Sequence, residues 1–169
     1  KSLTIQVAAA SYTLTTLVAS SSGNTVNFSY SGDQTIPAIT YNHLSFGGSG
    51  VKTLSGDFTV NGNLAISGTA ELYNPAYTLT GNLSGTFTMS SGTKMRLGNT
   101  STSTDVVYPI FYSKPNTTFD INSEVIYQGG GSQTVYPLLL NHSKWLYPTI
   151  RAIFLPKRPN TMCAFVSIA

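Results

Sequence analysis

Short stretches in which apolar and polar residues alternate recur along most of the chain. They are Leu3–Val7, Tyr12–Thr15, Asp57–Val60, Asn63–Ile66, Tyr77–Thr80, Thr86–Met89 and Lys94–Leu97. This period of two is typical of β-strands that bury one face. Turn-forming residues separate the stretches, for example at Ser22–Asn24, Gly47–Gly50 and Asn61–Asn63. No stretch has the period of a helix, so the pattern predicts an all-β protein.

Strands this short, joined by short turns, fit two architectures. The first is an antiparallel sandwich, in which neighbouring strands are joined by hairpins. The second is a parallel β-solenoid, in which each strand stacks on its counterpart one coil away. Alternation alone does not separate the two.

A gapless internal repeat favours the solenoid. Residues 24–46 are echoed by residues 123–145, so that Val26 reappears 99 positions later as Val125 and His43 as His142. A repeated supersecondary unit buries its apolar face against its neighbours. The repeat thus indicates an elongated repeat protein, and together with the family resemblance given below it leads us to expect a single-stranded, parallel, right-handed β-helix with coils of about 20 to 25 residues. The offset of 99 should then span a whole number of coils and place both histidines on one edge.

The same alternation predicts which side chains face inward. They are Phe58, Val60, Leu64, Ile66, Leu72, Leu79, Leu83, Phe87, Met89 and Leu97. We divide the chain into a solenoid, residues 1–143, and an atypical C-terminal segment, residues 144–169. This segment lacks glycine and brings in Trp145 and three prolines. It is interpreted as a cap on the last coil, a strand exchanged between subunits, or a product of truncation or a frame change; the first two are favoured.

Composition indicates a secreted protein. Hydrophobic residues make up 41% of the chain and charged residues only 9%, against about 25% in ordinary domains, with a net charge of +3. This balance argues against disorder. The one cysteine, Cys163, rules out an internal disulfide. No run of eighteen apolar residues predicts a membrane span, and no aromatic and basic stripe predicts nucleic-acid binding.

Four consecutive segments carry a family resemblance. They are Gly32–Ile36, Ala38–Phe46, Gly48–Gly56 and Val60–Gly68. Their sequence resembles the repeat of large secreted surface proteins of Bacteroidota, which are substrates of type nine secretion. The resemblance extends over about residues 24 to 98 and begins again at Val125. The resemblance implies an extracellular or cell-surface β-solenoid stalk or adhesin, and hence a non-catalytic structural or adhesive module.

Groups suited to catalysis are sparse. The acids are Asp33, Asp57, Glu71, Asp105, Asp120 and Glu124. His43, Ser45 and Asp57 could be drawn as a triad, but no nucleophile-elbow motif supports one, and we expect the histidines to flank turns. Neither zinc-ligand spacing nor a calcium loop occurs. We therefore expect no enzyme activity, no cofactor and no metal.

A polysaccharide-acting β-helix enzyme is the weakest alternative. It would need clustered carboxylates beside a basic residue. Lys94 and Arg96 share one strand face, but the nearest acids in the sequence are Glu71 and Asp105.

Aromatic residues offer a candidate interaction surface in the second half of the chain. The candidates are Tyr108, Phe111, Tyr112, Trp145 and Tyr147. Flat rings can stack on sugar faces, so a carbohydrate-binding module that contacts surface polysaccharide is the alternative function. Burial of these rings inside the solenoid or over its end is the simpler interpretation.

Self-association is the second interaction that we expect. Leu3, Ile5 and Val7 alternate as a strand near one end of the sequence. Phe165, Val166 and Ile168 do so near the other. Neither stretch carries the charges that usually protect a strand edge. Head-to-tail stacking or strand exchange would build a fibre, and a capped monomer is the competing expectation.

Overall fold

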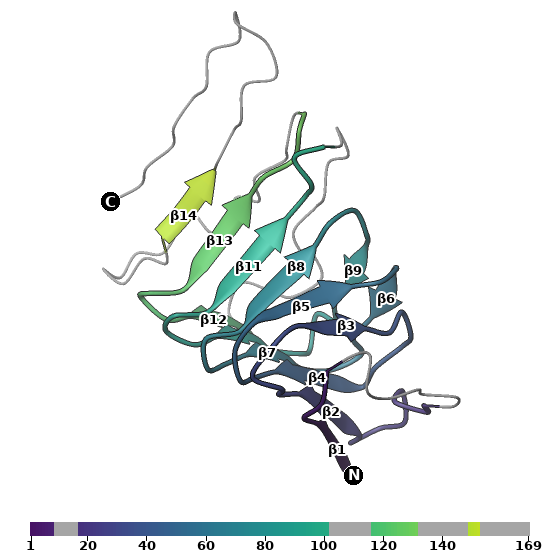
Figure 1. Ribbon diagram of the computed structural model, residues 1–169. Helices are drawn as coiled ribbons and strands as arrows, with labels where there is room; N and C mark the ends of the chain where they lie inside the picture. The colour runs from purple at the N-terminus through teal and green to yellow at the C-terminus, as the bar shows by residue number, and fades with distance from the viewer. Residues whose placement is uncertain (9–16, 102–115, 132–148, 153–169) are drawn as a thin grey trace, which may run out of the picture.

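The computed structural model describes residues 1–8, 17–101, 116–131 and 149–152 (Figure 1). Within these residues every regular element is a strand and none is a helix. No helix in the described residues is therefore long and apolar enough to cross a membrane. The absence of helical periodicity in the sequence agrees with this result.

The strands form two six-stranded sheets and one two-stranded sheet. Sheet A has the order β1 (Ser2–Ile5), β2 (Thr25–Phe28), β4 (His43–Phe46), β7 (Leu64–Ile66), β10 (Phe87–Met89) and β12 (Thr117–Phe119). Sheet B has the order β14 (Thr149–Ala152), β13 (Glu124–Tyr127), β11 (Lys94–Leu97), β8 (Glu71–Asn74), β5 (Val51–Leu54) and β3 (Gln34–Ile36). The third sheet pairs β6 (Phe58–Thr59) with β9 (Leu79–Thr80), and a parallel bridge joins Tyr41 to Val60 beside it.

Every strand pair is parallel. Consecutive strands such as β2 to β5 alternate between sheets A and B, so the strands that pair within a sheet are mostly not consecutive in the sequence. The prediction of a parallel all-β architecture is confirmed, and the antiparallel sandwich is wrong. The arrangement is compatible with a β-solenoid.

The two large sheets advance in step. From β2 to β4 in sheet A, Thr25 faces His43, and from β3 to β5 in sheet B, Gln34 faces Lys52, so the sequence offset is the same in both sheets. The next three steps are likewise equal in the two sheets. The pairs that give them are Leu44–Leu64 and Val51–Glu71, Leu64–Phe87 and Glu71–Lys94, and Phe87–Thr117 and Lys94–Glu124.

The length of these steps varies along the chain. Hydrogen bonds that join segments across the same four steps have sequence offsets of 18, 20, 23 and 30, in that order. The expected coil of about 20 to 25 residues therefore fits the middle two of these four steps. It also fits the steps from β1 to β2 and from β13 to β14, where Ser2 faces Thr25 and Glu124 faces Thr149. It is wrong for the step from β2 to β4, which is shorter, and for the step from β10 to β12, which is longer.

The internal repeat does not coincide with this spacing. Val26 lies in β2 of sheet A, whereas its sequence counterpart Val125 lies in β13 of sheet B. The expectation that the repeat offset spans a whole number of coils is therefore wrong. The turns between strands differ in length, so a constant offset carries a segment from one sheet to the other. His142, the counterpart of His43, lies outside the described residues.

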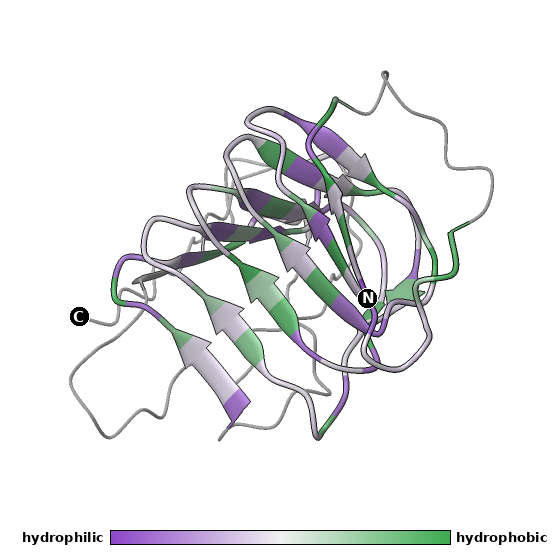
Figure 2. Cartoon of the chain, turned by 90° about the horizontal axis from the view of Figure 1, so that it is seen from below, coloured by the Kyte–Doolittle hydropathy of each residue, from purple (hydrophilic) through white to green (hydrophobic). Residues whose placement is uncertain are grey.

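The core lies between the sheets and is built from columns of stacked side chains. Figure 2 shows hydrophobic positions alternating with polar ones along the strands. One column of sheet A contains Phe28, Phe46, Ile66 and Met89, all almost completely buried. The Phe28 and Phe46 rings stack with centroids 6.4 Å apart, and Tyr41 meets Phe58 edge to face at 5.7 Å. Such aromatic pairs contribute about 0.5–1.5 kcal/mol beyond their buried area.

Nine of the ten predicted inward side chains are buried. Leu83 is the exception, because 66% of it is exposed. It lies between β9 and β10, where the backbone N–H of Ser84 donates to Asn82 Oδ1 at 2.7 Å. This local turn takes Leu83 out of the strand pattern, so its assignment to the core is wrong.

Glycines allow neighbouring turns to stack closely. Gly48 and Gly68 have φ values of 67° and 68°, in the left-handed region that favours glycine. The N–H of Thr69 donates to the carbonyl of Gly48 at 2.9 Å. A Cβ on Gly68 would lie 2.4 Å from that carbonyl oxygen. A side chain at this position would collide with the backbone of the neighbouring turn.

The C-terminal segment is described only at β14. This strand pairs in parallel with β13 and extends sheet B by one strand, so Thr149 faces Glu124. The rest of residues 144–169 lies outside the described residues.

Candidate functional site

Three of the aspartates bind backbone amides of neighbouring segments. The N–H of Val51 donates to Asp33 Oδ1 at 2.8 Å, and the N–H of Thr78 donates to Asp57 Oδ1 at 2.7 Å. Asp120 Oδ2 accepts from the N–H of Ser91 at 3.0 Å. In each case the bond crosses 18 to 29 positions of sequence. These carboxylates therefore satisfy donors that the parallel ladders leave at their ends.

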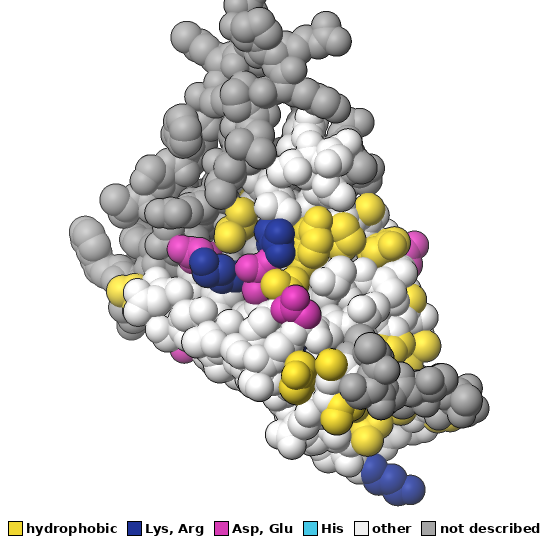
Figure 3. Space-filling model, in the orientation of Figure 1, with side chains coloured by type: hydrophobic (Ala, Val, Ile, Leu, Met, Phe, Trp, Pro, Cys, Tyr) yellow, Lys and Arg dark blue, Asp and Glu magenta, His cyan; other side chains and the backbone are white. Residues whose placement is uncertain are grey.

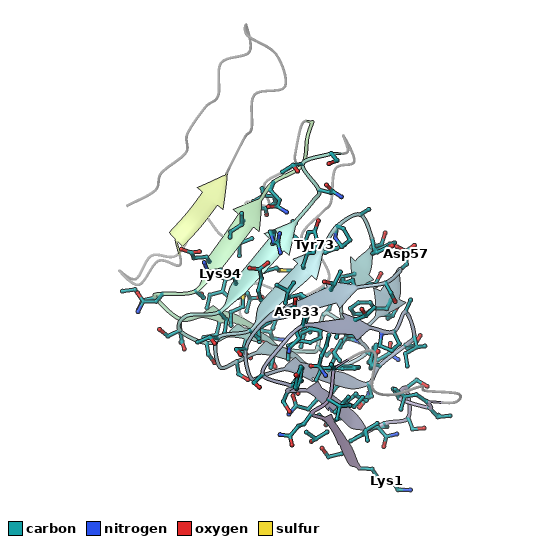
Figure 4. All side chains as sticks on the ribbon, viewed as in Figure 1. Lys1, Asp33, Asp57, Tyr73 and Lys94 are labelled. Atoms are coloured by element: carbon teal, nitrogen blue, oxygen red, sulfur yellow. The ribbon has the colours of Figure 1, made fainter. Side chains whose placement is uncertain are left out.

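The two glutamates of the described residues face outward from sheet B and are paired with cations. Arg96 Nε donates to Glu71 Oε1 at 2.5 Å, and Lys94 Nζ lies 3.3 Å from Glu124 Oε2. The Arg96 guanidinium also lies 4.0 Å from the centre of the Tyr73 ring. Figure 3 shows this charged cluster on the face of sheet B, and Figure 4 labels Lys94 and Tyr73 there.

This cluster is what a polysaccharide-acting enzyme would have to use. Lys94 stands in register between Glu71 and Glu124, so a cation separates the two carboxylates. Glycoside hydrolysis needs one carboxyl that is protonated and another that is ionised in the same cleft. In the described cluster each glutamate instead has its own cation, Arg96 for Glu71 and Lys94 for Glu124.

His43 is the first residue of β4 and directly follows the bend at Asn42. Its Nδ1 accepts the N–H of Asn63 at 2.9 Å, which leaves the ring proton on Nε2. Gly62 packs against the ring, since a Cβ there would lie 2.6 Å from Nδ1. Among the described residues no hydrogen bond joins His43 to Ser45 or to Asp57, whose carboxylate binds Thr78. The structure does not assemble the triad, and the prediction that His43 flanks a turn is confirmed.

A lysine and a glutamine fill polar positions inside the fold. Lys52 is completely buried, and its Nζ donates to the carbonyls of Tyr30, Gly32 and Ser49 at 2.7, 2.7 and 2.9 Å. All three ammonium protons thus have acceptors. Burial lowers the pKa of Lys52 from its ordinary value of 10.5, and the charge of Asp33 opposes this shift.

Gln34 occupies the same column one strand earlier. Its Nε2 donates to the carbonyls of Ile5 and Val7 at 3.1 and 3.0 Å, and its Oε1 accepts the N–H of Tyr30 at 3.2 Å. Sequence reasoning assigned no role to Lys52 or Gln34. A signal was present, because Lys52 alternates in phase with buried Leu54, and Gln34 with buried Ile36.

A shallow depression lies over the two-stranded sheet of β6 and β9. Its volume is about 380 Å³. The lining residues are Ala38, Ile39, Thr40, Asp57, Phe58, Thr59, Thr78 and Thr80. Four of these eight are threonines, and one is an exposed carboxylate. Figure 4 shows Asp57 at the right margin of the molecule, away from Lys94 and Tyr73 on sheet B.

The predicted aromatic surface and one predicted assembly strand are not described. Tyr108, Phe111, Tyr112, Trp145 and Tyr147 lie outside the described residues, as do Phe165, Val166 and Ile168. Of the other assembly strand, Leu3 and Val7 are 39% and 42% exposed, while Ile5 is buried.

Metal ligands do not gather in the described part of the chain. No group of three or more His, Cys, Asp or Glu side chains there could hold a metal ion. Comparisons with protein-family models, with curated proteins and with solved structures found no match.

Proposed function

We infer that this chain is a right-handed β-solenoid that serves as a non-catalytic structural or adhesive module outside the cell. The steps between paired strands are equal in sheets A and B although their offset changes along the chain. This equality supports the solenoid, because in a coiling chain each coil adds one strand to sheet A and one to sheet B. Right-handedness follows from the strong preference of parallel crossover connections for that hand.

The functional part of the proposal rests on the hydrogen bonds and ion pairs that the titratable side chains make. Asp33, Asp57 and Asp120 hold backbone amides, and both described glutamates are in ion pairs. His43 accepts a backbone N–H, and the ammonium of Lys52 donates to three carbonyls. A general acid or base must lie within hydrogen-bond reach of the substrate on which it acts. Here the charges mainly join one strand or turn to the next, as a scaffold requires.

The extracellular location rests on composition and on the resemblance to secreted Bacteroidota surface repeats. Only 9% of residues are charged, and polarity comes mostly from Ser, Thr, Asn and Gly. The segments that carry the resemblance, within residues 32–68, form part of the stacked strands and turns. The glycines and the lysine of Gly48–Leu54 also have structural roles that the repeat pattern would require.

End-to-end assembly into a fibre forms part of the proposal. Strand β1 stands at one end of the order of sheet A and pairs only with β2 among the described strands. Leu3 lies on the inward face of β1 and pairs with Val26 of β2. Leu3 is 39% exposed, whereas Val26 is only 2% exposed. An apolar strand edge of this kind is a template for another parallel strand.

A polymer-cleavage screen tests the non-catalytic assignment. The intact protein is incubated with a panel of polysaccharides, and released ends are measured by a reducing-sugar assay and mass spectrometry. We expect no turnover. Cleavage of any polymer that is abolished by Glu71→Gln or Asp57→Asn, with the fold intact by circular dichroism, would overturn the assignment.

A further inference from the structure

The depression over β6 and β9 has the chemistry of a ligand site. Strand pairing places Thr59 beside Thr80, and both face outward because Phe58 and Leu79 face the core. Thr40 and Thr78 complete the rim, and all four threonines are at least partly exposed. In the described part of the chain none of their hydroxyls bonds to a protein group. Four adjacent hydroxyls can thus donate and accept towards a ligand.

Asp57 adds one strong acceptor to this rim. Its Oδ1 accepts the N–H of Thr78 at 2.7 Å, which fixes the carboxylate beside the depression. Its Oδ2 has no partner among the described residues and is free to accept from a ligand hydroxyl. Hydrogen bonds from neutral donors to a carboxylate are stronger than those between neutral groups.

The rest of the lining limits what the ligand can be. Ala38 and Ile39 supply methyl groups beside a nearly buried Phe58, which is 5% exposed. No cationic side chain is among the described residues that line the depression, so Asp57 would repel an anion. One carboxylate is too few for a calcium ion, which takes six to eight oxygen ligands. A neutral molecule with several hydroxyls and an apolar face fits this lining.

We propose that this depression binds a neutral saccharide, with Asp57 Oδ2 and the threonine hydroxyls contacting sugar hydroxyls and Ala38 and Ile39 contacting the C–H face of the ring. The volume of about 380 Å³ lies near the lower end of the usual range for small-molecule sites, so one or two sugar rings are engaged. The inference deepens the adhesive part of the proposed function and rests on it, since binding occurs without turnover.

The test uses the ¹⁵N-labelled intact chain. Amide shifts are followed while cellotriose, xylotriose, mannotriose, maltotriose and galactotriose are each added to about 10 mM, where sites of millimolar Kd are occupied. We expect at least one of these neutral oligosaccharides to shift the amides of Thr59, Thr78 and Thr80 in a saturable way. If none of the five does so, or if the shifts map to another face, the proposal is wrong.

Two isosteric substitutions provide the matched comparison. Asp57→Asn keeps an oxygen for the N–H of Thr78 but loses the carboxylate, and we expect binding to weaken about tenfold or more. Asp33→Asn makes the same change where the carboxylate binds Val51 and does not line the depression, so it should bind as the wild type does. Equal affinity of the two variants would overturn the proposal.

A third variant and a separate assay complete the design. Thr59→Val removes one rim hydroxyl while keeping the β-branched shape, and it should weaken binding about fivefold. Unchanged affinity would argue against direct contact with the rim. Failure to bind any oligosaccharide leaves the non-catalytic assignment standing, whereas release of reducing ends from a polymer overturns that assignment. The two proposals can therefore fail separately.

Discussion

Lys52 faces Gln34 across the β3–β5 ladder, and both polar side chains point into the fold. The next residue of this column is Leu72, so the buried column changes from polar to apolar within one strand. Lys52 lies in β5, and its ammonium reaches back to the carbonyl of Ser49 in the preceding glycine-rich turn and to those of Tyr30 and Gly32. Lys52 thus joins two neighbouring turns through hydrogen bonds made inside the fold.

Replacing Lys52 with methionine should destabilise the protein. Methionine fills a similar volume but leaves three carbonyls without their donor, and unsatisfied buried groups cost about 1–3 kcal/mol. Urea unfolding of Lys52→Met should therefore show a lower free energy of unfolding by about that amount. Lys94→Met, which removes an exposed partner of Glu124, is the control and should change stability by less than about 1 kcal/mol. A Lys52→Met variant as stable as the wild type would contradict the assigned role.

The pH dependence of stability should report the same lysine. Burial lowers the pKa of Lys52 in the folded state below 10.5, its ordinary value, which we take for the unfolded chain. Between the two pKa values the unfolded chain binds more protons, so the free energy of unfolding should rise with pH there and level off above 10.5. Urea unfolding at a series of pH values measures the rise. If Lys52→Met shows the same rise as the wild type, its source lies elsewhere.

Two glycines should respond differently to alanine. Gly68 and Gly23 both have positive φ values, of 68° and 75°. A Cβ on Gly68 would meet the Gly48 carbonyl at 2.4 Å, whereas nothing lies within 4 Å of a Cβ on Gly23. Gly23→Ala should cost about 1–2 kcal/mol from backbone strain alone. Gly68→Ala should cost about 1–3 kcal/mol more, because backbone must move. Equal losses in thermal or urea unfolding would mean that the turns do not stack as described.

The ion pair between Arg96 and Glu71 should contribute modestly to stability. Both side chains are about a quarter exposed, and Arg96 also lies over the Tyr73 ring. Arg96→Lys loses the planar contact with Tyr73 and should cost about 0.5–1.5 kcal/mol. A double-mutant cycle with Glu71→Gln should give a coupling of about 0.5–1 kcal/mol that decreases with added salt. A coupling near zero at low salt would show that the contact is energetically neutral.

The sequence predicts which face of each strand is buried better than it predicts which strands pair with one another. Alternation correctly buries Phe58, Leu64 and Phe87, because a strand's side-chain period is fixed by backbone geometry. The same alternation places Lys52 inside, although lysine is rarely buried without partners. Those partners are carbonyls of turns that come together only after folding. The misplaced Leu83 has a similar origin, since a local turn around Asn82 interrupts the pattern.

Register between strands is harder to read from the sequence. The offset from one strand to its partner changes at every step along the chain, because the turns that join the strands vary in length. For this reason the internal repeat relates β2 to β13 in different sheets. It also explains why the pairing of Glu71 with Arg96, 25 positions apart, could not be anticipated, nor could the gathering of threonines around Asp57.

The assembly proposal makes a prediction at β1. Leu3 pairs with buried Val26 and lies on the inward face of β1. It is nevertheless 39% exposed, at one end of sheet A. A charge there should oppose the addition of a strand from another copy, because charged side chains protect strand edges. Sedimentation velocity over a series of concentrations should show wild-type species that grow with concentration, whereas Leu3→Lys should remain monomeric.

Leu83→Lys is the matched control for this prediction, since Leu83 is also exposed and apolar but lies in the turn between β9 and β10. It should assemble like the wild type if strand addition at β1, rather than general hydrophobic contact, drives association. Circular dichroism establishes that both variants remain folded. A wild-type protein that stays monomeric at the highest concentration would refute the fibre. If Leu3→Lys and Leu83→Lys inhibit association equally, strand addition at β1 is not its cause. The two positions share an exposed leucine, so general hydrophobic contact would then drive association.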